Sequence, residues 1–442
     1  MAHMAKDELV AAEAGDVAVD ASAPWLRRLA ALLHFLQYFL YAVCVILLIF
    51  LVTHLGIGKS FPAQPMMSMA PLLDESVLEV VATLPTPPGN LAVSKDNRIF
   101  FTFHPTYKPY PTKVAELVNQ THWVPYPSLE FQQSIISCLS VRIDVKNRLW
   151  ILDFAEHGFL GKPTLTSIEI TTNKVLSKYT FPRAVAGIGS MLNDFNVDPS
   201  GKYIYIADTN IVGMSPAIIV YSIDSNKAYR TLTDLPILHG DSYFLNIDGY
   251  KYGLGPFGVK VHVDSIAVDR KGDHLYFGAV TSNKLYSIST SYLLSYASYK
   301  HYDQRGRDLT KKKINENILM VTHLKPQSDG ITTDALENIL ITSIEHSALA
   351  VMQQRIVLGE VNGRQASHNV VKLVESKKYL QWPDGLSFGP DALYISNSHL
   401  HRLIPEVITN SKNLARKGPF HIVKIDQNYL AQVGIKMPTP GQ

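Results

Sequence analysis

Six polar residues with oxygen-bearing side chains stand at the starts of β-like segments that are far apart in the chain. They are Asn90, Asn193, Asp194, Asp264, Asp329 and Asp384. Carboxylate and amide oxygens are the ligands that Ca²⁺ prefers, and a bound Ca²⁺ can polarise a lactone carbonyl. The same residue types also form turns and satisfy backbone groups, so a purely structural role is the alternative.

Aromatic residues lie beside these segments. Phe195 and Trp382 are close in sequence to the polar set, and Tyr252 and Phe257 precede another of its members. A protonated amine binds well between a carboxylate and an aromatic face, so these residues are candidates for the wall of a binding site. Packing between sheets is the alternative role for each of them.

The segments that carry these residues form a sixfold repeat. Each copy is a small polar residue, an alternating apolar run, a turn, and a second β-rich run; the turns centre on Asn97, Asn147, Gly201, Gly272, Glu337 and Asp391. Each interval of 50 to 71 residues has room for a four-stranded sheet. Radial stacking would bury the sheet faces, so the pattern predicts an all-β, six-bladed β-propeller. The polar set is then expected to converge at one mouth of the central channel.

One segment is apolar enough to enter a membrane. Residues 29–52 contain no Asp, Glu, Lys or Arg, which predicts a transmembrane helix. Arg27 and Arg28 precede it, so the N-terminus is expected in the cytosol and the propeller in an extracellular, periplasmic or lumenal space. The alternative is a secretory signal whose cleavage releases a secreted protein. On the extracytoplasmic side of a eukaryotic membrane, Asn119-Gln-Thr121 would be an acceptor for N-glycosylation.

The predicted organisation has five parts: a cytosolic tail (1–28), a transmembrane helix (29–54), a stalk (55–74), the propeller (75–435) and a C-terminal tail (436–442).

A net charge of +3 gives no polyanion-binding signature, so no nucleic-acid partner is expected. The two cysteines, Cys44 and Cys138, are separated by the predicted membrane boundary and should not pair. Two histidines, His399 and His401, lack a third ligand for zinc.

Longer motifs resemble the Yellow and major royal jelly protein family. Residues 125–130 (PYPSLE), 140–144 (SVRID) and 147–153 (NRLWILD) are similar to the family's PYPSxE stretch and the SVxRVDxxxRLWVLD run that follows it. Further matches follow in the family's order and include residues 382–385 (WPDG) and 393–397 (LYISN). The resemblance implies a six-bladed propeller that is mostly secreted and, in some members, binds aromatic amines in its channel. Insect members usually carry paired cysteines and no membrane anchor, whereas here Cys138 has no partner in the predicted propeller and a predicted membrane span precedes it.

A second resemblance is to gluconolactonase, paraoxonase and strictosidine-synthase-like propellers. It rests on Asn193-Asp194 and on Pro383-Asp384-Gly385 at the starts of two copies of the repeat. In the hydrolytic members such an Asn and such an Asp help to hold Ca²⁺, which implies Asn193 and Asp384 as metal ligands. No early Glu matches a ligand motif, and Glu79 and Glu130 are the only candidates.

Three functions follow from these observations. The main hypothesis is a membrane-anchored, extracytoplasmic propeller that binds a small molecule, such as an aromatic amine, through Asn193, Asp194, Asp264, Asp329, Asp384, Phe195 and Trp382. The first alternative is a Ca²⁺-dependent lactonase or related hydrolase, and the second is a cell-surface platform for protein interactions. The sequence predicts neither the protein partners nor the oligomeric state.

Overall fold

The computed structural model describes residues 24–107, 110–247, 250–253, 255–298, 316–353, 370–402 and 418–438. Most of the predicted cytosolic tail and the end of the predicted C-terminal tail lie outside the described residues. The chain divides into two units, residues 1–53 and 54–442, which are described separately.

The first unit contains one long helix, α1 (Pro24–His54), whose large apolar side chains are exposed. Its apolar stretch, Arg28–His54, has 27 residues. At the rise of an α-helix it is about 40 Å long, more than the ~30 Å hydrocarbon core of a bilayer. The helix predicted at residues 29–54 is therefore present and can cross a membrane. A signal sequence has the same features, so the helix alone does not distinguish an anchor from a signal.

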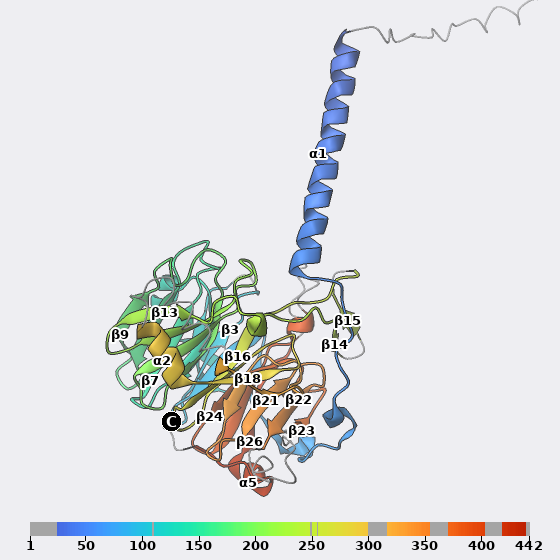
Figure 1. The fold of residues 1–442 in the computed structure, drawn as a ribbon. Helices are drawn as coiled ribbons and strands as arrows, with labels where there is room; N and C mark the ends of the chain where they lie inside the picture. Colours follow the sequence, from blue (N-terminus) through green and yellow to red (C-terminus); the bar gives the residue numbers. More distant parts are fainter. Residues whose placement is uncertain are drawn as a thin grey trace, which may run out of the picture. The chain divides into compact units, whose positions relative to one another are not determined.

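The second unit is a β-propeller, as predicted, and its described residues form six four-stranded antiparallel sheets (Figure 1). Each sheet is one blade, and its strands lie from the innermost to the outermost in the order in which they are named. The first three blades contain β2 (Pro88–Val93), β3 (Ile99–Phe103), β4 (Val114–Asn119) and β5 (His122–Pro125); β6 (Cys138–Ile143), β7 (Arg148–Asp153), β8 (Thr164–Glu169) and β9 (Lys174–Thr180); and β10 (Leu192–Val197), β11 (Tyr203–Asp208), β12 (Ala217–Ser222) and β13 (Lys227–Thr231).

The remaining blades follow the same plan. They contain β16 (Val263–Val268), β17 (His274–Ala279), β18 (Leu285–Ser289) and β19 (Leu319–Thr322); β20 (Ile331–Thr333), β21 (Ile339–Ser343), β22 (Ala348–Met352) and β23 (Val370–Glu375); and β24 (Pro383–Phe388), β25 (Ala392–Asn397), β26 (Phe420–Asp426) and β1 (Leu78–Leu84). A two-stranded hairpin lies outside the blades and consists of β14 (Leu245–Ile247) and β15 (Tyr250–Tyr252).

Short helices connect or flank the strands. They are α2 (Thr290–Ser298), α5 (Gln427–Gln432), η1 (Pro65–Ser68), η2 (Glu75–Val77), η3 (Phe131–Ser134), η4 (Pro236–Leu238) and η6 (Leu400–Arg402).

The N-terminal strand of the propeller completes its last blade. β1 pairs antiparallel with β26, from Leu78 opposite Ile425 to Leu84 opposite Phe420. The last blade is thus built from both ends of the propeller sequence. This pairing covers an edge that would otherwise be unpaired and closes the ring.

Five of the six predicted hairpin turns share a backbone conformation, and the turn at Asp391 does not. Asn97, Asn147, Gly201, Gly272 and Glu337 have φ between 57° and 79°, the left-handed region that a tight turn requires. In the second blade, Asp144 Oδ1 accepts hydrogen bonds from the backbone of Lys146 (2.9 Å) and Arg148 (3.0 Å). In the second to fifth blades an aspartate in this position accepts backbone hydrogen bonds beside the left-handed residue, whereas Ser94 does so in the first blade.

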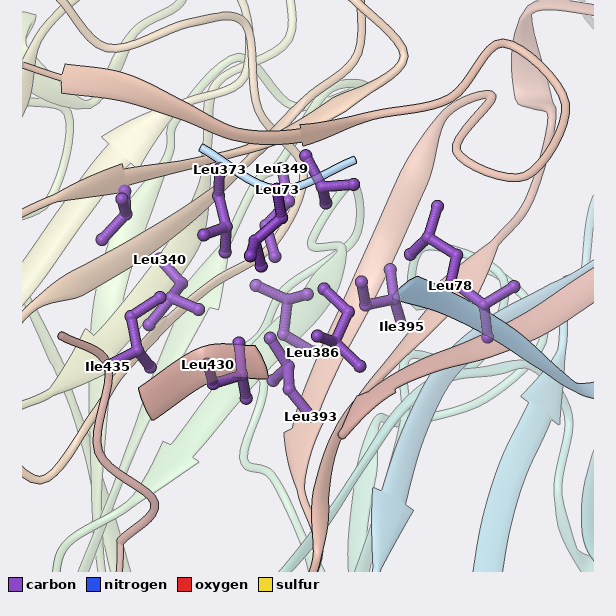
Figure 2. Close-up of a cluster of buried hydrophobic side chains, with 14 of the residues drawn as sticks. Leu73, Leu78, Leu340, Leu349, Leu373, Leu386, Leu393, Ile395, Leu430 and Ile435 are labelled. Atoms are coloured by element: carbon purple, nitrogen blue, oxygen red, sulfur yellow. The ribbon is translucent and has the colours of Figure 1, made fainter. Parts of the chain in front are cut away.

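The hydrophobic core is divided among the gaps between blades. One cluster lies between the last two blades, with Leu340 and Leu349 on one side and Leu386, Leu393 and Ile395 on the other (Figure 2). Each of the other gaps between neighbouring blades contains a similar cluster. No blade can bury its faces alone, so the blades stabilise one another.

Residues 55–74, predicted to be a stalk, make several contacts with the propeller. Met66 is 1% exposed and belongs to the cluster between the fourth and fifth blades, and Leu73 belongs to the next cluster. The Gln64 side chain donates a 2.6 Å hydrogen bond to the carbonyl of Lys325. Part of this segment is therefore attached to the propeller. The boundaries of the five predicted regions remain predictions.

Closure of the ring by β1 can be tested by deletion. A chain that begins at residue 86 lacks β1, leaves the edge of β26 unpaired and removes Ala82 and Leu84 from the core. We expect it to lose cooperative thermal unfolding measured by circular dichroism, whereas a matched chain that begins at residue 75 retains it. Equal melting temperatures for the two chains would show that β1 is dispensable.

Candidate functional site

The predicted polar residues lie at irregularities in the pairing of the innermost strands. The register shifts between Pro88 and Leu91 in β2, and corresponding shifts occur near the starts of β6, β10, β16 and β24. These shifts include the positions of Asn90, Asn193, Asp194, Asp264 and Asp384. A β-bulge turns side chains out of the regular alternation of a strand. The bulges thus allow polar side chains to point into the channel.

Hydroxyl groups on the second strands hold the bulges in place. Thr102 Oγ1 accepts a hydrogen bond from the Asn90 backbone (3.0 Å) and donates one to the Leu139 carbonyl of the next blade (2.7 Å). Ser396 Oγ links Gly385 (2.9 Å) to Gly89 (2.5 Å) in the same way. The sequence interpretation missed these residues, although Thr102, Thr342 and Ser396 occupy similar places in the repeat.

The polar residues from different blades meet in one small cavity, which we call the acidic cavity. Its volume is about 10 Å³, of the order that one water molecule needs. Its lining consists of Asn90, Leu139, Ser140, Asn193, Asp194, Asp264, Asp329, Gly330 and Asp384. The structure therefore brings together all six polar residues singled out from the sequence, whereas their role in binding remains a prediction.

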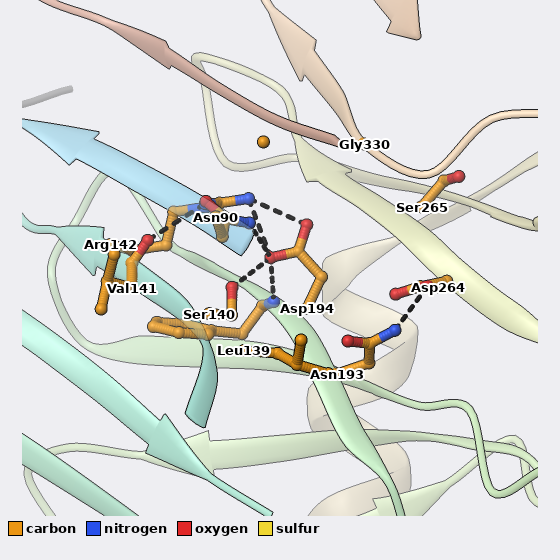
Figure 3. A network of polar contacts seen from close by, with 12 residues as sticks. Asn90, Leu139, Ser140, Val141, Arg142, Asn193, Asp194, Asp264, Ser265 and Gly330 are labelled. Atoms are coloured by element: carbon orange, nitrogen blue, oxygen red, sulfur yellow. Dashed lines mark hydrogen bonds and ion pairs between the residues drawn. The ribbon is translucent and has the colours of Figure 1, made fainter. Parts of the chain in front are cut away.

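One side of the acidic cavity is electrically balanced by an arginine (Figure 3). Arg142 Nη2 lies 2.8 Å from both carboxylate oxygens of Asp194, and the Arg142 guanidinium also donates to Asn90 Oδ1. Ser140 Oγ (2.6 Å) and Asn90 Nδ2 (3.2 Å) donate to the same carboxylate. Asp194 is thus fully engaged by neighbouring side chains.

Arg142 was not among the predicted site residues, although the sequence contains a signal for it. The corresponding positions in the other copies of the repeat carry small or neutral residues, namely Ala92, Asn196, Ala267, Thr332 and Ser387. A single charge at a repeat position that otherwise faces the channel is therefore a usable signal.

The other side of the acidic cavity holds three carboxyl groups. Burial raises the pKa of Asp264 and Asp384 well above the usual range, and repulsion from Asp329 and Asp194 adds to this effect. Burial also raises the pKa of Asp329, against the effect of hydrogen bonds from Trp382 and Asp264. Because the charges of Asp264 and Asp329 affect each other, the two carboxyl groups titrate as a pair and not independently.

Two neutral side chains orient this carboxyl pair. Asn193 Nδ2 donates a 2.5 Å hydrogen bond to Asp264 Oδ2, visible in Figure 3, and Trp382 Nε1 donates a 2.7 Å bond to Asp329 Oδ2. The amide of Asn193 is therefore directed at a carboxylate. Trp382 contributes a polar N–H to the site as well as an aromatic ring.

A buried lysine lies near the same carboxyl pair. Burial lowers the pKa of Lys325 to about 7, although attraction to Asp264 and Asp329 acts in the opposite direction. Its ammonium donates to the Pro326 carbonyl (3.0 Å) and to Ser328 Oγ (2.9 Å). Lys325 therefore partly balances the charge of Asp264 and Asp329, while these two hydrogen bonds go to Pro326 and Ser328.

The predicted aromatic wall is only partly present. Trp382 stacks on His401 with ring centroids 6.3 Å apart, and it packs with Leu245 and Ile247 of the β14–β15 hairpin. Tyr252 is packed against the same cluster. Phe195 is completely buried in the core between the second and third blades and is absent from the cavity lining, because the bulge before it turns Asp194 inward instead.

The acidic cavity has suitable chemistry for a hard cation but an incomplete geometry for Ca²⁺. Asn193, Asp264, Asp329 and Asp384 would supply oxygen ligands, and Ca²⁺ takes six to eight of them. However, no group of three or more His, Cys, Asp and Glu residues in the described part of the chain is arranged to hold a metal ion. The nearby charges of Arg142 and Lys325 already offset part of the negative charge. The residues as arranged therefore do not define a Ca²⁺ site.

Comparison with solved structures identifies the class of fold. The chain is similar to regucalcin from Agrobacterium tumefaciens, described as a calcium-binding protein, with a TM-score of 0.50 and 13% identity. The similarity covers 84% of this chain and 98% of the bacterial protein. At this identity the match shows a shared propeller fold.

The family follows from the sequence. The model of the major royal jelly protein family matches residues 136–415, which is more than half of the chain, so the chain belongs to this family. Protein yellow from Drosophila pseudoobscura pseudoobscura is 25% identical over 250 residues, or 48% of this chain and 42% of the relative. Major royal jelly protein 3 from Apis mellifera is 25% identical over 182 residues, or 38% of this chain and 32% of the relative. The matches span less than half the length of these relatives.

Replacement of Arg142 by Ala tests the charge balance around Asp194. Removal of one partner of a buried ion pair leaves an uncompensated charge and typically costs about 3–5 kcal/mol. We expect Arg142→Ala to lower the free energy of unfolding by an amount in this range in chemical denaturation. The control is Lys424→Ala, which removes a more exposed pair with Glu79 and should cost at most about 1 kcal/mol. Equal effects would contradict the assigned role of Arg142.

Asp384→Asn tests the cost of the buried carboxyl groups. The folded protein has a raised pKa at Asp384, so it binds a proton more tightly than the unfolded chain does. Asp384 therefore destabilises the folded wild-type protein once the pH rises above about 4, the pKa of an unperturbed aspartate. This destabilisation persists above the raised pKa of Asp384. We expect the variant to be more stable than wild type at pH 8, by about 1.4 kcal/mol per pKa unit, and equally stable near pH 3.

Thermal denaturation of both proteins at the two pH values measures this difference. The exposed Asp224→Asn substitution is the control and should change stability little at either pH. A loss of stability in Asp384→Asn at pH 8 would mean that the Asp384 charge is already compensated.

Proposed function

We propose that this member of the major royal jelly protein family binds the cationic head group of a small molecule in the acidic cavity. The observation that carries the proposal is the convergence of Asp264, Asp329 and Asp384, all with raised pKa values, on one small cavity. Perturbed carboxyl groups in a cavity are characteristic of functional sites. A bound cation would favour their charged forms and offset the cost of their burial.

The size of the acidic cavity supports a primary ammonium group. A volume of about 10 Å³ is close to that needed by one water molecule, and a primary ammonium is of similar size. A quaternary ammonium is too large for this space. The indole of Trp382, which contacts Asp329, is the aromatic group best placed to support an amine. A whole aromatic amine does not fit in the acidic cavity, so only its head group is assigned to it.

A Ca²⁺-dependent hydrolase is the second candidate, with Asn193 and Asp384 as ligands. The oxygen-rich lining and the fold shared with a calcium-binding protein support it. A bound Ca²⁺ would supply Lewis-acid activation of a carbonyl. The incomplete ligand geometry makes this candidate weaker than a binder of amines. The role as a cell-surface platform for protein interactions remains a prediction, and no contact described above specifically supports it.

We further propose that α1 is a retained anchor and that the propeller lies outside the cytosol. The apolar stretch of 27 residues is longer than the 7–15 residues typical of the core of a secretory signal. The arginines at positions 27 and 28 support a cytosolic N-terminus. A cleaved signal is the alternative and leads to the same side of the membrane.

Expression in a eukaryotic host tests this topology. Asn119 is exposed at the end of β4, so a lumenal propeller presents it for glycosylation. We expect a glycosidase-sensitive mass shift that Asn119→Gln abolishes, and retention of the protein in carbonate-washed membranes. An unglycosylated protein would contradict the lumenal orientation, and release into the medium would favour a cleaved signal over an anchor.

Calorimetry of the full chain in detergent micelles tests the proposed ligand class. Tryptamine carries a primary ammonium on an indole ring, and tryptophol carries a hydroxyl in its place. We expect saturable binding of tryptamine, at least tenfold weaker binding of tryptophol, and at least a tenfold loss in Asp329→Asn and Asp384→Asn. Asp224→Asn is the matched control and should bind like wild type.

The same titrations separate the two candidate functions. Tryptamine binding that survives chelation of divalent ions supports the amine binder. Stoichiometric Ca²⁺ binding together with hydrolysis of a lactone, both lost in Asp384→Asn, would replace it with the hydrolase. No binding of either cation would overturn the proposal of a cation site.

A further inference from the structure

A second cavity occupies the opposite end of the innermost strands. Its volume is about 250 Å³, just below the ~300–1,000 Å³ usual for sites that bind small molecules. Its walls include apolar residues from several blades, namely Val93, Ile143, Val197, Val268, Leu386 and Phe388. We call it the basic cavity because of the charges described next. The proposed function does not use it.

Most of the charged side chains that line this cavity are basic. Lys95, Arg142, Lys146 and Arg270 line it, and both lysines are exposed at turns. Asp144 is the one carboxylate in the described lining. It lies 2.6 Å from Arg148 Nη2 and accepts a 2.8 Å hydrogen bond from Trp150 Nε1, so its charge is already compensated.

Arg270 is a buried arginine whose charged form is disfavoured by its surroundings. Burial lowers the pKa of Arg270 to about 10, against the attraction of Glu337 and Asp334. Its guanidinium donates to the Thr333 carbonyl and lies 5.8 Å from the centroid of the Phe388 ring. A bound anion would stabilise this charged form in a partly desolvated position.

Arg142 connects the two cavities. Its side chain lines the basic cavity, and its guanidinium pairs with Asp194 in the lining of the acidic cavity. The channel is therefore acidic at one end and basic at the other. Ligands of opposite charge are expected at the two ends.

We propose that the basic cavity binds a small organic anion with an apolar body, such as an aromatic or branched carboxylate. The lysines at the rim and Arg270 attract the anionic group, and the valine, isoleucine, leucine and phenylalanine side chains bury the apolar part. This site is separate from the proposed amine site, so either can fail without the other.

Indole-3-acetate is a suitable probe because it has the indole ring of tryptamine and the opposite charge. Calorimetry of the full chain in detergent micelles should show saturable binding of indole-3-acetate at least tenfold tighter than that of neutral tryptophol. A double substitution, Lys95→Gln with Lys146→Gln, should weaken this binding at least fivefold and leave tryptamine binding unchanged. A second variant, Asn196→Trp, fills the basic cavity and should abolish the binding of indole-3-acetate.

The matched control is Lys174→Gln with Lys227→Gln, which removes two exposed charges from outer strands. It should bind indole-3-acetate as wild type does. Three results would overturn the proposal: affinity no greater than that of tryptophol, equal weakening by the rim and control substitutions, or full binding in a folded Asn196→Trp variant. Should Asn196→Trp not fold, the rim and control variants still decide the question.

Discussion

The pairing of β1 with β26 closes the propeller, and both cavities depend on that closure. The side chains of the acidic cavity come from positions as far apart as Asn90 and Asp384. A ring is what brings such positions to one axis, because each innermost strand is held there by the apolar clusters on both sides of its blade. Hydroxyl groups such as those of Thr102 and Ser396 then join neighbouring blades around the channel.

The acidic cavity stores unfavourable free energy that packing elsewhere offsets. Buried carboxyl groups without full compensation destabilise a folded protein, and a chain selected only for stability would replace them. Asp194 is fully compensated by Arg142, Ser140 and Asn90. Asp264, Asp329 and Asp384 are not, since their pKa values remain raised despite Lys325 nearby. This contrast within one cavity is the reason to assign a ligand to one side of it.

Much of the architecture could be predicted from the sequence because repeats report it directly. The turn residues recur with left-handed backbone at Asn97, Asn147 and Gly201, and the polar residues at strand starts do meet. Side-chain direction was harder to predict, because a bulge exchanges the inward and outward faces of a strand. Phe195 packs between the second and third blades and does not line the acidic cavity, and Arg142 was missed.

Other features depended on contacts that no local pattern encodes. Residues 55–74 lack periodicity, yet Met66 and Leu73 fit into gaps between blades. Lys325 lies outside the repeat, in the connection between the fourth and fifth blades, and no local pattern indicates its attraction to Asp264 and Asp329. The identity of a ligand is even less accessible, because propellers with the same fold carry unrelated functions.

The most direct measurement is the number of protons released when tryptamine binds near neutral pH, obtained by calorimetry in buffers of different ionisation enthalpy. The ammonium group enters already charged, so it should displace a proton from the carboxyl groups of Asp264 and Asp329, whose pKa values are raised by burial. The account predicts release of about one proton per bound amine, and little release in Asp264→Asn. Binding of tryptamine with no release of protons would contradict a cation site built on these carboxyl groups.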